Sequence, residues 1–336
     1  YFEKLCLIQI STADLHVLVD PLAGISLQPL FEALADKDLV FHGADYDLRL
    51  LRRSAGFEPV RIFDTMIAAR LVGDPEFSLA ALVRKYFGVE LVKASQKANW
   101  AQRPLSEKMA EYAMNDSRYV LELSDILRKR LLELGRWEWF AQSCEKAVAS
   151  ARTTRERDLE NAWRIRGSSE LTGIATALLR ALWNWREEEA KAVDRPPFHI
   201  LQNEQLVGAA AALARGELPQ FHRMNLSRWN RFKVAADTAL RLPESQWPKP
   251  IPRLRLRQTP EQERRFFQLK KIRDSAATEL VLDPSMIAPK AVLESLANDE
   301  DGAADKLMPW QLGLLGLTDV DRRNFLPGPE FNSAKL

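Results

Sequence analysis

A helical pattern surrounds the stretch Glu111-Tyr-Ala-Met-Asn-Asp-Ser-Arg-Tyr-Val-Leu-Glu-Leu123, beginning near Ser106 and ending at Gly135. Tyr112 and Asp116 are four residues apart, so they share one face of this predicted helix. A phenol beside a carboxylate suits a site in which water attacks a metal-held phosphate. The same pair also fits a half-buried packing tyrosine and a solvated aspartate, so the spacing is not decisive by itself.

Upstream of that helix, strand and helix patterns alternate. Lys4–Ile10 is a nearly continuous apolar run, typical of a buried strand, and Leu15–Asp20 follows it after a hairpin turn. Short strands at 39–42 and 60–63 then alternate with helices at 27–35, 44–55, 64–73 and 78–88. This order predicts an α/β domain whose mixed sheet carries helices on both faces.

Three aspartates lie at the predicted strand-to-helix junctions. Asp45 and Asp47 follow the strand at 39–42, and on a helix they cannot both point the same way. Ligands of open α/β sheets collect at such junctions, so one of the two is a candidate for the site. Asp64 stands at the start of the next helix, where a capping role is favoured over a ligand role.

These residues carry a resemblance to ribonuclease D, of the DEDD superfamily of 3′→5′ exonucleases, in the subclass with a catalytic tyrosine. The segment His42-Gly-Ala-Asp-Tyr-Asp47 resembles the second motif of that family and selects Asp47 over Asp45. Tyr112 and Asp116 resemble the third motif, Tyr-x-x-x-Asp. Two further stretches resemble ribonuclease D, Phe63–Leu71 and Ser95–Ser106. The resemblance implies a ribonuclease H-like nuclease domain.

The first motif of the resembled family, Asp-x-Glu, is absent from this sequence, which begins at Tyr1 without Met. Glu3 does not replace it, because by spacing Glu3 falls in the following strand segment. Two of the four metal-binding carboxylates that the resemblance implies are therefore missing, as is the central strand, whose loss leaves an unpaired edge. We expect the motif to exist outside this sequence; the alternative is a natural pseudo-enzyme.

The resemblance also implies a mechanism. Four carboxylates would hold two divalent ions, Mg²⁺ or Mn²⁺, around the scissile phosphate, where one ion lowers the pKa of the attacking water. Asp47 and Asp116 would be metal ligands, and Tyr112 would orient the water. The expected reaction is hydrolysis from the 3′ end of RNA, such as a tRNA precursor, with release of nucleoside monophosphates.

Four residues near these motifs are candidate nucleic-acid contacts. His42 could touch sugar or phosphate, although a packed histidine at a strand end is the more common case. Gln96, Trp100 and Arg103 lie on the loop that leads to the helix of Tyr112. Arg103 could bind a phosphate, and Trp100 could either stack on a base or pack against the sheet.

The second half of the chain is predicted to be helical and to contain a repeat at an offset of 87 residues. The recurring pairs are Leu182 and Leu269, Arg186 and Arg273, Pro197 and Pro284, Ile200 and Ile287, Leu206 and Leu293, and Ala210 and Ala297. We expect a nuclease domain at 1–150, a helical domain at 151–242, a Pro/Arg-rich linker at 243–259 and a second helical domain at 260–336. The helical pair resembles the tandem HRDC domains of ribonuclease D.

Positive charge is concentrated in residues 222–273, which carry 14 basic and four acidic side chains, whereas the whole chain has a net charge of +2. Such a zone suggests a polyanionic partner, although a solvated linker rich in arginine would look the same. Arg253, Arg255 and Arg257 alternate with leucines, so we expect them to contact a nucleic-acid backbone. Alternatively, the helical domains only brace the nuclease fold.

The totals fit two or three domains in 336 residues. No apolar run reaches the ~18 residues of a membrane span, and two cysteines, Cys6 and Cys144, suit a reducing, cytoplasmic compartment. We expect a monomeric 3′→5′ exoribonuclease that binds RNA. The alternatives are a non-catalytic RNA-binding protein with a decayed nuclease fold and a DNA 3′→5′ exonuclease, because the motifs do not separate RNA from DNA.

Overall fold

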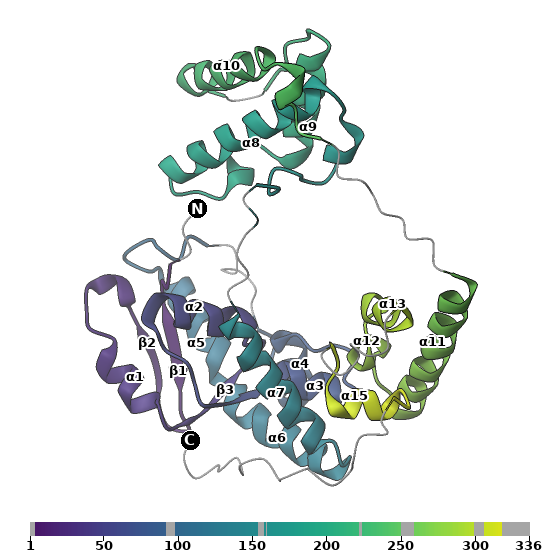
Figure 1. The fold of residues 1–336 in the computed structure, drawn as a ribbon. Helices are drawn as coiled ribbons and strands as arrows, with labels where there is room; N and C mark the ends of the chain where they lie inside the picture. Colours follow the sequence, from purple (N-terminus) through teal and green to yellow (C-terminus); the bar gives the residue numbers. More distant parts are fainter. Residues whose placement is uncertain are drawn as a thin grey trace. The chain divides into compact units, whose positions relative to one another are not determined.

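The computed structural model describes residues 4–91, 98–153, 158, 160–221, 224–249, 259–298 and 306–317. The chain divides into two compact units (Figure 1). One contains Arg155–Leu256, and the other contains Lys4–Thr154 together with Arg257–Leu336. The second unit is therefore built from two segments that are far apart in the sequence.

Four short strands form two separate two-stranded sheets within the described residues. β1 (Ile8–Ser11) pairs antiparallel with β2 (His16–Val19), and β3 (Asp38–Phe41) pairs parallel with β4 (Arg61–Asp64). Both pairing directions of the predicted mixed sheet occur, but the single sheet does not. Among the described strands, β1 and β3 form no ladder with each other, so the two pairs stay separate.

Seven labelled helices surround these strands: α1 (Gln28–Leu34), α2 (Asp45–Ala55), α3 (Thr65–Leu71), α4 (Leu79–Phe87), α5 (Glu107–Arg118), α6 (Val120–Glu133) and α7 (Trp137–Arg152). α5 packs on β1 and β2, α6 on β3, and α7 on β4. Ser78 and Ser106 cap α4 and α5 through their side chains, as hydroxyls at an N-cap do. Each sheet thus has its own covering helices (Figure 1).

The predicted continuous helix from Ser106 to Gly135 is two helices, α5 and α6, that meet at Tyr119. The Tyr119 ring lies 5.5 Å from the ring of Phe87, which fixes the junction against α4. The break allows α5 to pack on the β1–β2 sheet and α6 to pack on β3 and α3. One straight helix would have to serve both surfaces, so tertiary packing overrides the continuous helical pattern.

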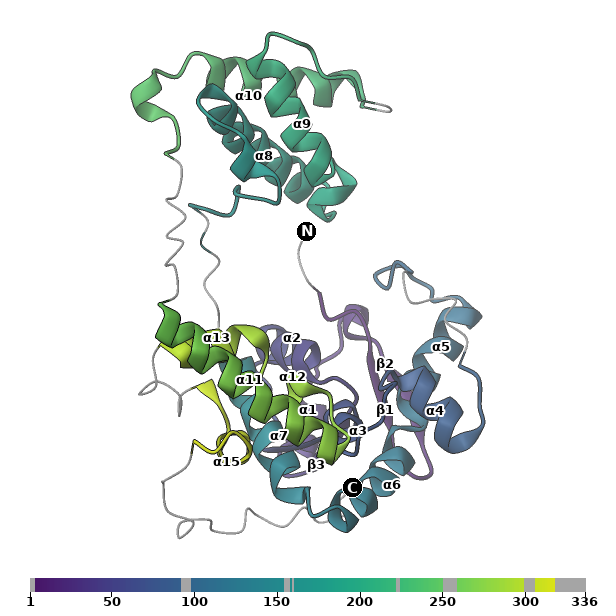
Figure 2. The ribbon, with the colours of Figure 1, turned by 90° about the vertical axis from the view of Figure 1, so that its right-hand side faces the viewer.

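The unit Arg155–Leu256 is helical, with α8 (Ile174–Ala192), the 3₁₀ turn η3 (Pro197–His199), α9 (Asn203–Ala214) and α10 (Leu226–Leu240). α9 and α10 both pack on α8 (Figure 2). Its core includes Leu178, Leu182, Leu206 and Phe232, which are fully buried. This unit has a hydrophobic core of its own.

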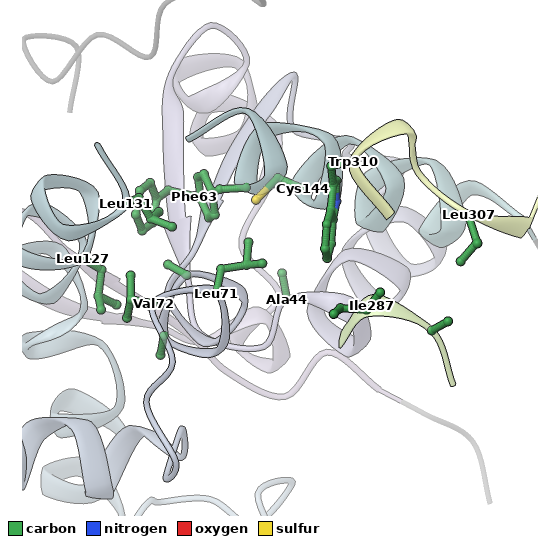
Figure 3. Close-up of a cluster of buried hydrophobic side chains, with 14 of the residues drawn as sticks. Ala44, Phe63, Leu71, Val72, Leu127, Leu131, Cys144, Ile287, Leu307 and Trp310 are labelled. Atoms are coloured by element: carbon green, nitrogen blue, oxygen red, sulfur yellow. The ribbon is translucent and has the colours of Figure 1, made fainter. Parts of the chain in front are cut away.

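The C-terminal helices α11 (Pro260–Leu280), α12 (Pro284–Ile287), α13 (Lys290–Asn298) and α15 (Pro309–Leu314) share a hydrophobic core with the segment Lys4–Thr154 of the same unit. Figure 3 shows Ile287, Leu307 and Trp310 in one cluster with Phe63, Leu71 and Cys144. The Trp310 ring also stacks on Trp139 of α7, with ring centroids 5.0 Å apart. The C-terminal region is thus a helical extension of the core of the segment Lys4–Thr154.

Two further features bear on the sequence predictions. None of the helices in the described ranges combines the length and the apolar character that crossing a bilayer requires. Both cysteines are free thiols, with Cys144 buried and Cys6 half-buried.

Candidate active site

Asp64 joins the two strand-to-helix junctions of the β3–β4 sheet. Its Oδ1 accepts hydrogen bonds from the backbone N–H of Gly43 (2.9 Å), Met66 (2.8 Å) and Ile67 (3.3 Å), and its Oδ2 accepts one from Ala44 (2.8 Å). Asp64 therefore caps α3, as its position predicted, and it also fixes the loop that leads into α2. Its side chain is buried, and all four of these hydrogen-bond partners are backbone N–H groups.

Asp47 lies in the first turn of α2, beside Asp64. Desolvation by the surrounding protein, and then the charge of Asp64, raise the pKa of Asp47 to about 6. The Asp47 side chain nevertheless stays exposed to solvent. Asp45 differs, because it forms an ion pair with Arg49 on the outside of α2. The structure therefore places the two aspartates in different surroundings.

His42 is half-buried at the end of β3, and its Nδ1 lies 2.9 Å from Thr65 Oγ1. Thr65 Oγ1 donates its own proton to Phe41 O, at 3.0 Å. His42 Nδ1 must then be the donor in the first bond, which assigns the Nδ1–H tautomer and leaves Nε2 with the lone pair. Burial lowers the pKa of His42, against the opposing charge of Asp64, so the imidazole is neutral near pH 7.

Tyr112 and Asp116 lie together on α5, as the spacing predicted. Desolvation raises the pKa of Asp116 to about 6, although this residue too is exposed by surface area. Desolvation, and then the charge of Asp116, raise the pKa of Tyr112 above its ordinary value. Both raised pKa values favour the protonated side chains. Acids that are partly removed from water, or that lie beside another acid, have raised pKa values for this reason.

The side chains that anchor α5 had no signal in the sequence. Ser117, which follows Asp116, lies with its Oγ 2.8 Å from Ser11 Oγ on β1. His16 Nδ1 of β2 lies 2.9 Å from the same Ser11 Oγ. This chain of polar contacts ties α5, and with it Tyr112, to the β1–β2 sheet.

Trp100 lies against Tyr112, with ring centroids 6.0 Å apart and an interplanar angle of 41°. This geometry is an ordinary tilted aromatic contact. It supports the packing alternative for Trp100, and stacking on a base stays a prediction. The ring contact places the loop of Trp100 directly beside the proposed water-orienting phenol.

Arg103 is engaged within the protein by all five of its N–H groups. Its Nε and Nη2 donate to the Asp20 carboxylate at 2.5 and 2.6 Å, and Nη2 also donates to Cys6 O at 2.6 Å. Its Nη1 donates to the carbonyls of Trp100 (2.9 Å) and Gln102 (2.8 Å). A guanidinium has five donors, so a phosphate contact would require one of these bonds to break. The pKa of Asp20 is lowered, first by its hydrogen bonds to Arg103.

Four of the predicted nucleic-acid contacts fall on residues that the structure does not describe. Gln96, Arg253, Arg255 and Arg257 lie outside the described residues. Within the described ranges, no group of three or more His, Cys, Asp or Glu side chains is arranged to hold a metal ion. That Asp47 and Asp116 share an ion therefore stays a prediction.

The sequence also missed Asp20, the partner of Arg103. Asp20 ends the predicted second strand and precedes Pro21, and its Oδ1 accepts the N–H of Leu22 at 3.0 Å as a helix cap. The Asp-Pro pair signals such a cap. The ion pair with Arg103, 83 residues away, leaves no local signal.

Comparison with known proteins identifies the two regions. A family model described as a 3′-5′ exonuclease matches residues 1–132, and an HRDC domain model matches residues 175–217. The ribonuclease D of Bartonella henselae is 30% identical over 240 residues, which are 70% of this chain and 59% of that protein. The ribonuclease D of Pseudomonas paraeruginosa is 29% identical over 306 residues, or 88% of this chain and 80% of that protein.

Solved structures show the same fold. Escherichia coli RNase D aligns with a TM-score of 0.65 at 23% identity, over 93% of this chain and 88% of that one. The catalytic core of RRP6 from Trypanosoma brucei aligns with a TM-score of 0.61 at 27% identity, over 70% and 68% of the two chains. The chain spans between 54% and 59% of the length of four of its ribonuclease D relatives. It belongs to the ribonuclease D family, with a 3′-5′ exonuclease domain followed by an HRDC domain and a helical C-terminal region.

Proposed function

We propose that this chain carries the nuclease region of a 3′→5′ exoribonuclease that removes nucleoside monophosphates from RNA, with tRNA precursor-like molecules as the substrate class. The observation that carries the proposal is the pairing of Tyr112 with Asp116 on α5, where both acids have raised pKa values. Perturbed acids that lie side by side are a mark of functional sites. The match to ribonuclease D relatives supplies the reaction class.

The donor chemistry of the site suits a hard divalent cation, Mg²⁺ or Mn²⁺. Asp47 and Asp116 present carboxylate oxygens, and their raised pKa values mean that the charged forms lack sufficient compensation from the protein alone. Mg²⁺ keeps several waters and takes phosphate oxygens, so few protein ligands can serve each ion. When bound, such ions lower the pKa of the attacking water and stabilise the leaving oxygen. Asp47 and Asp116 are two of the four ligands that the family resemblance implies.

Tyr112 is proposed to orient the nucleophile. Its pKa is raised above an ordinary value of 10.0, so the phenol is protonated near pH 7 and cannot act as a general base there. In the reaction, the water oxygen forms a bond to phosphorus and the bond from phosphorus to the 3′ oxygen breaks. The proton lost by water balances the proton gained by the new 3′ hydroxyl. The phenol hydrogen-bonds the water throughout.

Two side chains are proposed to meet the RNA near this site. The His42 tautomer assigned above leaves Nε2 as an acceptor, which suits a ribose hydroxyl better than a phosphate. The part of the Trp100 ring that does not contact Tyr112 would stack on a base. The HRDC domain would add phosphate contacts that give affinity without sequence choice.

We further propose that the C-terminal helices are a second HRDC-like copy. In the first copy, Arg186 Nη1 donates to Leu201 O at 3.1 Å; in the second, Arg273 Nη1 donates to Ala288 O at 3.0 Å. Donor and acceptor are both displaced by 87 residues, the same offset as the sequence repeat. A shared hydrogen bond at matched positions supports a structural repeat more strongly than apolar periodicity does.

The test is release of a labelled nucleotide from the 3′ end of RNA in Mg²⁺ or Mn²⁺. Asp116→Asn and Asp47→Asn should each lower the rate by at least ~100-fold, because a metal ligand is lost. Tyr112→Phe should lower it by roughly 10²–10³-fold, through loss of one preorganised hydrogen bond. Asp45→Asn is the matched control, since Asp45 is on the same helix but pairs with Arg49.

Three outcomes would contradict parts of this proposal. Full activity in Asp116→Asn and Tyr112→Phe would reject the assigned site. RNA binding without hydrolysis in the unaltered protein would identify a non-catalytic RNA-binding protein. Equal rates on DNA and RNA of the same sequence would remove the assignment to RNA.

A further inference from the structure

We propose that Arg103 and Asp20 form a clamp that positions Trp100 against Tyr112, so that Arg103 is a positioning residue and not a phosphate contact. The inference rests on the function proposed above, in which Tyr112 orients the attacking water. Three observations support it. All five N–H groups of Arg103 donate hydrogen bonds within the protein, and two of their acceptors, Asp20 and Cys6 O, lie beside β2 and β1. The third observation is the ring contact between Trp100 and Tyr112.

The Arg103 guanidinium is fixed at points that are distant in the sequence. It meets Asp20, which directly follows β2, in a two-pronged ion pair at 2.5 and 2.6 Å, and it meets Cys6 O just before β1 at 2.6 Å. Paired parallel hydrogen bonds of this kind have a defined geometry as well as charge. Asp20 is itself held by the N–H of Leu22 at 3.0 Å. The clamp therefore anchors the loop of Arg103 to the β1–β2 sheet.

The remaining N–H groups of the guanidinium bind the backbone of the loop that carries Trp100. Arg103 Nη1 donates to the carbonyls of Trp100 and Gln102, so the backbone on both sides of residue 101 is fixed. The Trp100 ring then lies 6.0 Å from the Tyr112 ring. Tyr112 is on α5, which packs on the same two strands, so one sheet supports both members of the ring pair. Arg103 thereby acts on Tyr112 through Trp100.

A phosphate contact and a clamp predict opposite effects for changes at Asp20. If Arg103 bound phosphate, Asp20→Asn would release a charged donor and leave RNA affinity equal or higher. If Arg103 is a clamp, Asp20→Asn loosens the loop, and hydrolysis falls while the salt dependence of RNA binding stays the same. Arg103→Lys should have the same effect, because lysine keeps the charge but cannot make five directed bonds.

The functional arm compares single-turnover hydrolysis with RNA affinity measured in EDTA. We expect Asp20→Asn and Arg103→Lys each to slow hydrolysis by about tenfold to a hundredfold, the effect of a small displacement of a reacting group. The salt slope of the RNA dissociation constant should stay unchanged, because no phosphate contact is lost. The double variant should be no slower than either single variant, since both break one unit. Arg84→Lys is the matched control, because Arg84 pairs with Glu76 away from this loop.

The structural arm does not depend on activity. The chain has five tyrosines, so protein labelled with 3-fluorotyrosine should give five fluorine resonances, and Tyr112→Phe assigns one of them. Asp20→Asn and Arg103→Lys should move the Tyr112 resonance toward its position in Trp100→Ala, where the neighbouring ring is gone. The other tyrosine resonances, including those of Tyr86 and Tyr119, should not move, which shows that each variant is folded.

An unmoved Tyr112 resonance in both Asp20→Asn and Arg103→Lys would overturn the clamp, whatever the activity. A salt slope lowered by about one in Arg103→Ala, with hydrolysis unaffected by Asp20→Asn, would also overturn it and assign Arg103 to phosphate. If the unaltered protein releases no nucleotide, the proposed function fails, and the fluorine spectra still decide whether the clamp exists.

Discussion

The raised pKa values of Asp47 and Asp116 lower the stability of the folded protein at neutral pH. The pKa of each rises from a reference value of 3.8 to about 6 in the folded protein, mainly through desolvation. Between about pH 4 and pH 6 the folded state holds these protons while the unfolded chain releases them. The stabilisation from the protonated carboxyls is therefore complete at low pH and is lost as the pH rises through about 6.

At pH 7 without divalent ions, Asp47→Asn and Asp116→Asn should each raise the melting temperature, because each removes an uncompensated charge. The gain should be below about 1 kcal/mol apiece, since both side chains are open to solvent and screened. The variants should also flatten the fall in stability between pH 4 and 6, as followed by thermal melts in EDTA. Asp45→Asn should change neither the melting temperature nor its pH dependence. If Asp47→Asn and Asp116→Asn both melt at or below the temperature of the unaltered protein, the pKa values of these two aspartates are not raised.

Single residues were predictable where their role is local. The pairing of Tyr112 with Asp116 follows from helical spacing, and the cap at Asp64 follows from its place before a helix. The second role of Asp64, holding the N–H groups of Gly43 and Ala44, depends on β3 and β4 lying side by side. No property of the residues near Asp64 in the sequence encodes that contact.

At the scale of elements, the end of α3 meets the end of α11 through backbone groups. Arg136 is buried and bridges them, donating to Leu71 O and to Leu280 O, each at 2.7 Å. Gly73 has a φ of +85°, and a Cβ placed there would lie 2.6 Å from Val281 O. Glycine is needed at this position both for its backbone conformation and for the close approach of α11.

Gly73→Ala should therefore destabilise the protein more than Gly88→Ala does. Gly88 also has a left-handed φ, +69°, but a Cβ there meets nothing within 4 Å. We expect about 1–2 kcal/mol for the strain at either site, and about 1–3 kcal/mol more at Gly73 for the displaced backbone. Urea unfolding of the two variants gives the comparison, and equal losses would show that α11 does not approach α3 as closely as described.

Elements also explain why charge counting overstated the basic surface. Arg228 and Arg231 belong to the zone 222–273, but both bond to Glu189 of α8, and hydrogen bonding to Arg231 is the first cause of the lowered pKa of Glu189. Their charge is therefore partly neutralised within the helical unit. Sequence counts cannot show this pairing, because Glu189 lies about 40 residues upstream.

In the whole molecule, the two segments related by the predicted 87-residue repeat have different surroundings. Leu182 is buried in the core of the unit Arg155–Leu256, whereas its counterpart Leu269 is buried in the core shared with the nuclease part. Leu182 of the first segment therefore belongs to the core of its own unit, whereas Leu269 of the second segment belongs to the core of the nuclease part. The domain boundaries predicted at 242 and 260 stay predictions.

Leu182→Ala and Leu269→Ala form a matched pair that tests this arrangement. Each should cost about 2–5 kcal/mol, the usual loss for a buried leucine. Hydrogen exchange should quicken in α9 and α10 for Leu182→Ala, and in α3 and α7 for Leu269→Ala, because local opening follows the weakened core. Unchanged protection of α3 and α7 in Leu269→Ala would show that the C-terminal helices do not stabilise the nuclease part.

Sequence by itself determined the features that act within a few residues or recur at a fixed interval: the face shared by Tyr112 and Asp116, the helix caps, and the 87-residue repeat. Helical spacing and capping depend on neighbours within a turn or two, so the local order of residues is sufficient. Only the tertiary structure decided that Arg103 binds Asp20 and that the second repeat joins the nuclease core. Those contacts form between segments that are far apart in the sequence. Strand pairing and burial bring these segments together only when the chain folds.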